Sequence, residues 1–187
     1  MQTLGLSDST PRTESRLKSL FWPSIQSGAD VDYLAVQGFW VCTIVGVAGL
    51  GFLALNRQPI TGILVFLLFH LGGVGVREHN PFAAAMVLIY FVLDTLVSGI
   101  GVVRIIITAL LLSNLRATWI SDHWKPESEE AALPPRLGDT FSDKVADQWP
   151  AFIWPKIKWL YYVYSFLLLA LTLAGIILLY LRRGVIR

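Results

Sequence analysis

The sequence predicts an all-α integral membrane protein, a polytopic helical bundle with five transmembrane segments. Only 15% of its 187 residues are charged and 55% are hydrophobic, whereas a typical soluble domain carries about 25% charged residues. A soluble protein of this size needs more charged side chains than this on its surface. We therefore expect lipid to cover much of the surface. The charges are also absent from several long runs and gather between them.

The first two apolar runs predict a helical hairpin. Residues 33–55 carry no charge and are long enough, at about 1.5 Å per residue, to cross a hydrocarbon core of about 30 Å. Residues 59–76 contain His70 as their one ionisable group. They begin with Pro59, which suits the first turn of a helix because no N–H is needed there. Three residues separate the runs, so the two helices are expected to be antiparallel.

The region 82–120 allows two interpretations, because it is too long for one simple crossing. In the first, a turn near Gly99 divides it into spans 82–97 and 102–118, which gives five spans. In the second, one long helix covers 82–120, which gives four. Cytoplasmic segments tend to hold the Lys and Arg residues, and the five-span arrangement places ten of the 15 on the N-terminal side. This bias favours five spans, with the N-terminus inside and the C-terminus outside.

The remaining segments lie outside these spans or complete them. Residues 1–32 are polar and allow a short amphipathic helix, and no signal sequence is expected in them. Residues 119–158 are expected to be an extramembrane or interfacial loop. This loop has a short amphipathic helix near 140–149 that Pro150 is expected to end. Residues 159–187 form the last transmembrane helix and a basic C-terminal tail.

Aromatic and basic residues alternate just before the last span. Trp149, Trp154 and Trp159 are interleaved with Lys156 and Lys158. Indoles favour the membrane–water interface and lysines favour anionic headgroups, so one interpretation places this segment in the headgroup layer. The other makes it a docking surface for a protein partner, since tryptophans often carry binding energy.

Two polar features lie within the apolar runs. Asp94 and Arg104 either pair across the turn of the five-span arrangement or form, with Tyr90, an intramembrane polar site for a proton or cation. His70 is either a hydrogen-bonded packing residue or a haem ligand, and no second axial ligand is expected at matching depth. We therefore expect no cofactor and no metal site.

The sequence contains none of the common catalytic motifs, such as H-E-x-x-H, G-x-S-x-G or a glycine-rich phosphate loop. A net charge of +2 without a basic cluster excludes nucleic acid as a partner. We expect a non-enzymatic accessory or scaffold component in a bacterial-type plasma membrane, with membrane lipid and either a protein partner or a second copy as partners. The alternative is a small transporter or channel that uses Asp94 and Arg104. A membrane enzyme acting on lipid through His123 and Trp124 is a third hypothesis.

Overall fold

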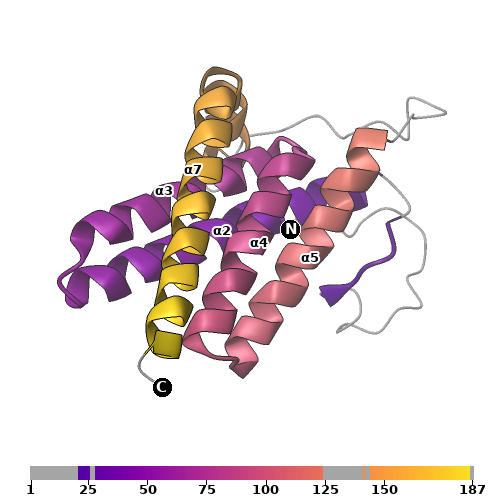
Figure 1. Cartoon of the computed structure of the whole chain (residues 1–187). Coiled ribbons are helices and arrows are strands. Elements are labelled where there is room, and N and C mark those ends of the chain that lie inside the picture. Colours follow the sequence, from indigo (N-terminus) through magenta and orange to yellow (C-terminus); the bar gives the residue numbers. More distant parts are fainter. Residues whose placement is uncertain (1–20, 26–27, 124–140, 142–143, 186–187) are drawn as a thin grey trace.

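A computed structural model describes residues 21–25, 28–123, 141 and 144–185 of the chain (Figure 1). Every regular element in this part of the chain is a helix. The amphipathic helix expected within 1–32 and the central part of the 119–158 loop lie outside the described residues.

Five of the helices are long and apolar enough to cross a membrane. They are α2 (Gly28–Leu55), α3 (Pro59–Arg77), α4 (Pro81–Ser98), α5 (Val102–His123) and α7 (Trp149–Val185). This confirms the division into five apolar helices, and the alternative of one long helix over 82–120 is wrong. The chain leaves α4 at Gly99, whose φ of +102° favours glycine because it has no Cβ.

The segment before the last span differs from the sequence prediction. Instead of a separate helix that Pro150 ends, a π-helical turn, η2 (Lys144–Gln148), leads directly into α7. Pro150 falls in the first turn of α7, where its fixed φ suits the helix. Pro155 also lies inside this helix. The described part of the expected amphipathic helix, residues 144–149, and the last span are therefore one continuous helical unit.

The centre of the bundle is α3, which packs against α2, α4 and α7. Glycines make this possible because they let the helix backbones approach closely. A Cβ added at Gly75 would lie 2.4 Å from the Cβ of Ala83 on α4 and 2.6 Å from the indole of Trp154 on α7. A Cβ at Gly73 would lie 2.8 Å from the Cβ of Cys42 on α2.

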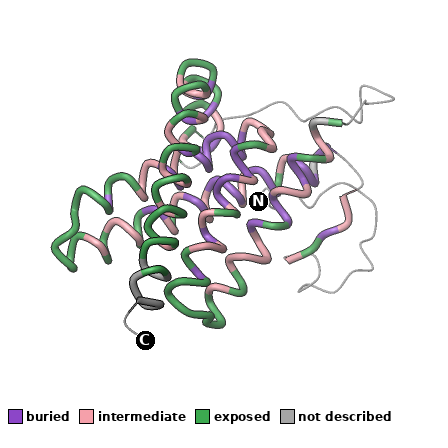
Figure 2. The backbone as a smooth tube through the Cα atoms, viewed as in Figure 1, coloured by how far each residue is buried: buried purple, intermediate pink, exposed green. Residues whose placement is uncertain are grey.

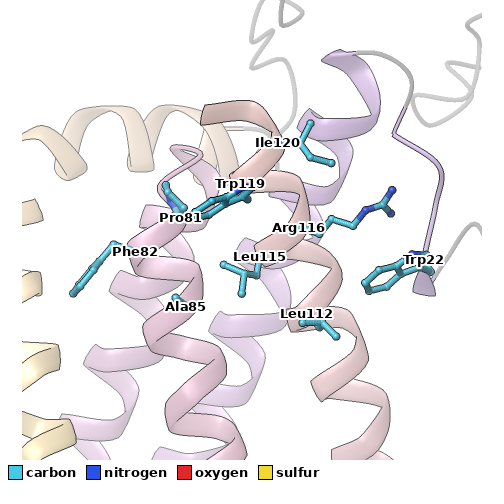
Figure 3. Close-up of a pocket in the computed structure, with 9 residues that line it drawn as sticks. All are labelled: Trp22, Pro81, Phe82, Ala85, Leu112, Leu115, Arg116, Trp119 and Ile120. Atoms are coloured by element: carbon cyan, nitrogen blue, oxygen red, sulfur yellow. The ribbon is translucent and has the colours of Figure 1, made fainter. Parts of the chain in front are cut away.

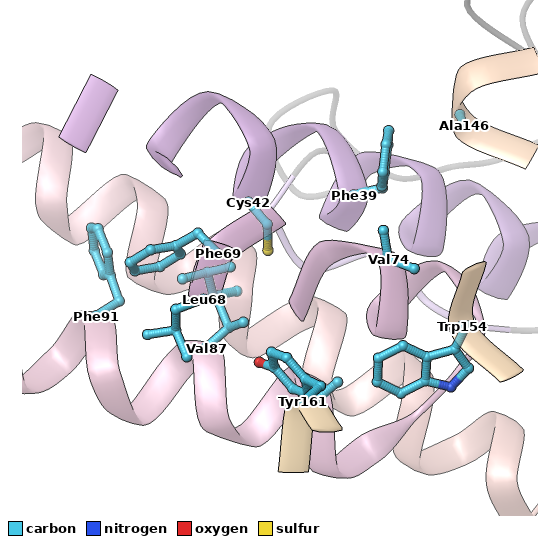
Figure 4. Close-up of a cluster of buried hydrophobic side chains, with 12 residues drawn as sticks. Phe39, Cys42, Leu68, Phe69, Val74, Val87, Phe91, Ala146, Trp154 and Tyr161 are labelled. Atoms are coloured by element: carbon cyan, nitrogen blue, oxygen red, sulfur yellow. The ribbon is translucent and has the colours of Figure 1, made fainter. Parts of the chain in front are cut away.

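The buried side chains concentrate around this second half of α3 (Figure 4). They include Phe39 and Cys42 from α2, Val87 from α4 and Tyr161 from α7. The outer end of the α2–α3 hairpin projects from this core and is largely exposed (Figure 2). The bundle is thus tightly packed at the end where α3 finishes and α7 begins, and open at the α2–α3 turn.

Candidate functional site

The best-defined polar cluster lies where α3 ends against the beginning of α7. Arg77, the last residue of α3, has a side chain that is only 1% exposed. Its Nη1 atom lies 2.5 Å from a carboxylate oxygen of Asp32 on α2, and its Nη2 atom lies 2.7 Å from Asp147 in η2. One guanidinium therefore joins three elements of the bundle through charge-assisted hydrogen bonds.

Arg77 also binds the backbone of the segment that precedes α7. Its Nε atom donates to the carbonyl oxygen of Ala146 at 3.2 Å and to Asp147 at 3.1 Å. Pro150, four residues after Ala146, has no N–H to offer that carbonyl in a helical turn. The guanidinium thus supplies that carbonyl with a donor that Pro150 cannot supply. We call Arg77, Asp32, Asp147 and the Ala146 carbonyl the Arg77 clamp.

The Arg77 clamp was not predicted from the sequence. Its acidic partners lie 45 and 70 positions away along the chain. No local spacing rule connects residues so far apart. The one local signal is Pro150, because a proline inside a helical segment leaves a carbonyl without its usual donor.

The structure divides the predicted aromatic and basic residues of this segment into two groups. Trp149 and Trp159 are 45% and 71% exposed, and Lys156 is also exposed, whereas Trp154 is 6% exposed and packs against Gly75. Lys158 is half-buried. The spacing of three and four residues places Trp149, Phe152, Lys156 and Trp159 on one side of α7. The Lys156 amine lies 3.4 Å from the centre of the Phe152 ring. We call these four residues the aromatic–basic face.

His70 lies on α3, between α2 and the aromatic–basic face. The Thr43 hydroxyl lies 2.8 Å from the Phe39 carbonyl oxygen and 3.2 Å from the Nδ1 atom of His70, within hydrogen-bond distance of both. The ring also stacks on Phe66, with centroids 5.3 Å apart. Both contacts are typical of a histidine that packs in a helix interface and forms a hydrogen bond. The described residues contain no group of three His, Cys, Asp or Glu side chains that could hold a metal ion.

Asp94 and Arg104 meet at the opposite end of the bundle. Their side chains form an ion pair of 2.6 Å that bridges α4 and α5 across the turn. The carboxylate also accepts from Ser98 at 3.2 Å. Asp94 is 47% exposed and Arg104 is 32% exposed. Tyr90 lies one turn before Asp94 on α4, and its ring packs edge-on against Phe69 of α3 with centroids 6.0 Å apart.

The lipid-enzyme hypothesis named His123 and Trp124. The ring of His123 stacks on Trp119 of the same helix, and its Nδ1 atom lies 2.9 Å from the Trp119 carbonyl oxygen. Trp124 lies outside the described residues. This geometry is a local contact at the end of α5, and no carboxylate among the described residues forms an ion pair or hydrogen bond with His123.

No family model, no curated protein and no solved structure matches this chain.

Proposed function

We propose that this protein is a small multi-pass membrane scaffold that presents the aromatic–basic face as a fixed docking surface for a partner protein. The observation that carries this proposal is the Arg77 clamp. The Arg77 side chain is buried and its two carboxylate partners are partly buried, so removing one partner costs up to about 3–5 kcal/mol. The clamp therefore fixes the start of α7 relative to α2 and α3.

The membrane placement is supported by the distribution of apolar and charged side chains. Five helices have the length and hydropathy of membrane spans, and large apolar side chains such as Phe52, Leu171 and Leu178 are more than half exposed. Lipid is the solvent in which such a surface is stable. The excess of Lys and Arg on the N-terminal side favours a cytoplasmic N-terminus. A plasma membrane of bacterial type is the proposed location.

The clamp favours a protein partner over simple contact with headgroups. A segment that only rests in the headgroup layer needs no buried ion cluster, because an amphipathic helix binds there by its apolar face alone. A docking surface benefits from rigidity, since side chains already held in place lose less entropy on binding. Trp149 and Trp159 are also the residue type most enriched among binding hot spots.

Cysteine labelling tests the membrane placement. In a Cys42→Ala background, Ile100→Cys in the α4–α5 turn and Ser128→Cys in the loop should react with an impermeant maleimide from opposite sides of the membrane. Labelling of both positions from the same side would contradict the five-span arrangement.

Photo-crosslinking tests the docking surface. A photoreactive phenylalanine analogue is placed at Phe152, on the aromatic–basic face, or at Phe166 further along α7. The two side chains are 63% and 67% exposed, so they form a matched pair. Position 152 should give one discrete protein adduct that is lost when Trp149→Ala and Lys156→Ala are combined, while position 166 gives only lipid adducts. Lipid adducts alone at both positions, or an adduct containing only a second copy of this chain, would reject the scaffold proposal.

A further inference from the structure

A second surface feature lies on the other side of the bundle, between α4 and α5. It is a groove of about 800 Å³ at the end where α5 finishes (Figure 3). Its walls are apolar and include Phe82 and Ala85 from α4 and Leu112 and Leu115 from α5. The volume lies in the range of about 300–1,000 Å³ that is typical of small-ligand sites.

One charged side chain, Arg116, contributes to this groove. Its Nη1 atom donates to the carbonyl of Pro23 at 2.9 Å, and its guanidinium lies 5.1 Å from the centre of the Trp22 ring. Trp22 therefore holds the guanidinium by a cation–π contact. The other N–H groups of Arg116 have no hydrogen-bond acceptor among the described residues.

Arg116 differs from Arg77 and Arg104, which also lie near the ends of packed helices. Arg77 is paired with two aspartates, and Arg104 is paired with Asp94. No carboxylate among the described residues lies within 4.0 Å of Arg116. Among the described residues, the half-buried guanidinium of Arg116 therefore has no carboxylate to balance its positive charge. An anion in the groove could balance this charge and accept hydrogen bonds from its remaining N–H groups.

The surroundings indicate which anion fits. Arg116 lies seven residues before the end of α5, about 10 Å along the helix axis. Trp22 and Trp119 flank it, and tryptophan favours the membrane interface. A guanidinium can bind phosphate through two parallel hydrogen bonds. Basic pockets between transmembrane helices on the cytoplasmic side bind anionic lipid headgroups.

We infer that this groove is a binding site for an anionic phospholipid, with an acyl chain between α4 and α5 and the phosphate on Arg116. The inference rests on the proposed membrane placement but not on the aromatic–basic face. The labelling experiment above tests the placement separately, so a failure of this site can be told from a failure of that proposal.

Native mass spectrometry of the full-length protein in detergent tests the phosphate contact. Phosphatidylglycerol should bind more tightly than phosphatidylcholine, and Arg116→Gln should weaken phosphatidylglycerol binding about tenfold or more. Arg57→Gln is the matched control, because Arg57 is an exposed arginine in the α2–α3 turn. Equal binding of both lipids, or equal binding by Arg116→Gln and the wild type, would overturn the site.

A second variant tests the acyl groove and covers the case in which Arg116→Gln fails to fold. Ala85→Phe fills the groove and leaves Arg116 in place, so it should weaken phosphatidylglycerol binding by a similar factor with an unchanged melting temperature. Glycerol 3-phosphate, which has the same phosphate but no acyl chain, should not compete. Full phosphatidylglycerol binding by Ala85→Phe, or displacement by glycerol 3-phosphate, would show that the groove is not used.

Discussion

The two ends of the bundle contain the same kind of contact in different surroundings. At one end Arg77 bonds Asp32 and Asp147 with a side chain that is 1% exposed, and at the other end Arg104 bonds Asp94 with both side chains about a third to a half exposed. The shortest distances are nearly equal, at 2.5 Å and 2.6 Å. Distance alone therefore does not tell which ion pair contributes more to stability. The pairs differ in how far their side chains are buried and in how many helical elements they join.

The two ends also differ in how the backbone around them is built. At the Arg77 end, α3 touches α2, α4 and α7 through glycines. At the other end, the turns after α2 and α4 are exposed, and an added Cβ at Gly51, Gly99 or Gly101 would meet nothing within 4 Å. The closest helix approaches thus lie at the end that bears the proposed docking surface, whereas the glycines at Gly51, Gly99 and Gly101 have open space around them.

The largest effect is expected from Arg77→Gln. This change leaves the partly buried Asp32 and Asp147 without their cation, so it should lower the free energy of unfolding by up to about 3–5 kcal/mol. Thermal or denaturant unfolding of the purified protein in detergent measures this loss. A loss below about 1 kcal/mol would show that the clamp does not hold α7 in place, and the proposed rigid docking surface would lose its basis.

A smaller effect is expected from Gly75→Ala. The new methyl group would overlap Ala83 and the Trp154 indole, and overpacking of this kind costs about 1–3 kcal/mol. Gly51→Ala on α2 is the matched control because its Cβ meets open space. Alanine is the better helix former, so this control should stabilise the protein slightly or leave it unchanged. If both variants unfolded at the same denaturant concentration, the contrast between the two ends would be wrong.

The smallest effect is expected from the exposed pair. Asp94→Asn, Arg104→Gln and the double variant should form a cycle with a coupling energy of about 0.2–1 kcal/mol, as is typical of exposed pairs. High salt should reduce this coupling, whereas it should barely change the effect of Arg77→Gln.

The same Asp94→Asn variant tests the transport hypothesis. Reconstituted vesicles should show no proton or cation flux that depends on Asp94, because an arginine already neutralises the carboxylate at the turn. A flux that the wild type supports and Asp94→Asn abolishes would make the protein a transporter rather than a scaffold.

Features that depend on neighbours in the sequence were predictable. The five apolar helices follow from uninterrupted hydrophobic runs. The turn between α4 and α5 follows from its glycines, whose freedom at positive φ allows the chain to reverse. Asp94 and Arg104 flank this turn only ten positions apart, so a hairpin brings them together without help from any other element.

Other features depend on which helices pack together, and these required the tertiary structure. Trp154 and Trp159 are both tryptophans beside lysines, yet only Trp154 faces Gly75 and is buried. The sequence predicted that Pro150 ends a helix, but α7 continues past it. Arg77 donates to the Ala146 carbonyl, to which Pro150 can offer no N–H. Sequence patterning determined that the described part of the chain has five long apolar helices and about where α3, α4 and α5 begin, but not where α7 begins. Only the packing of distant segments decided which charges are buried together, because the partners of Arg77 are set by tertiary contact and not by spacing.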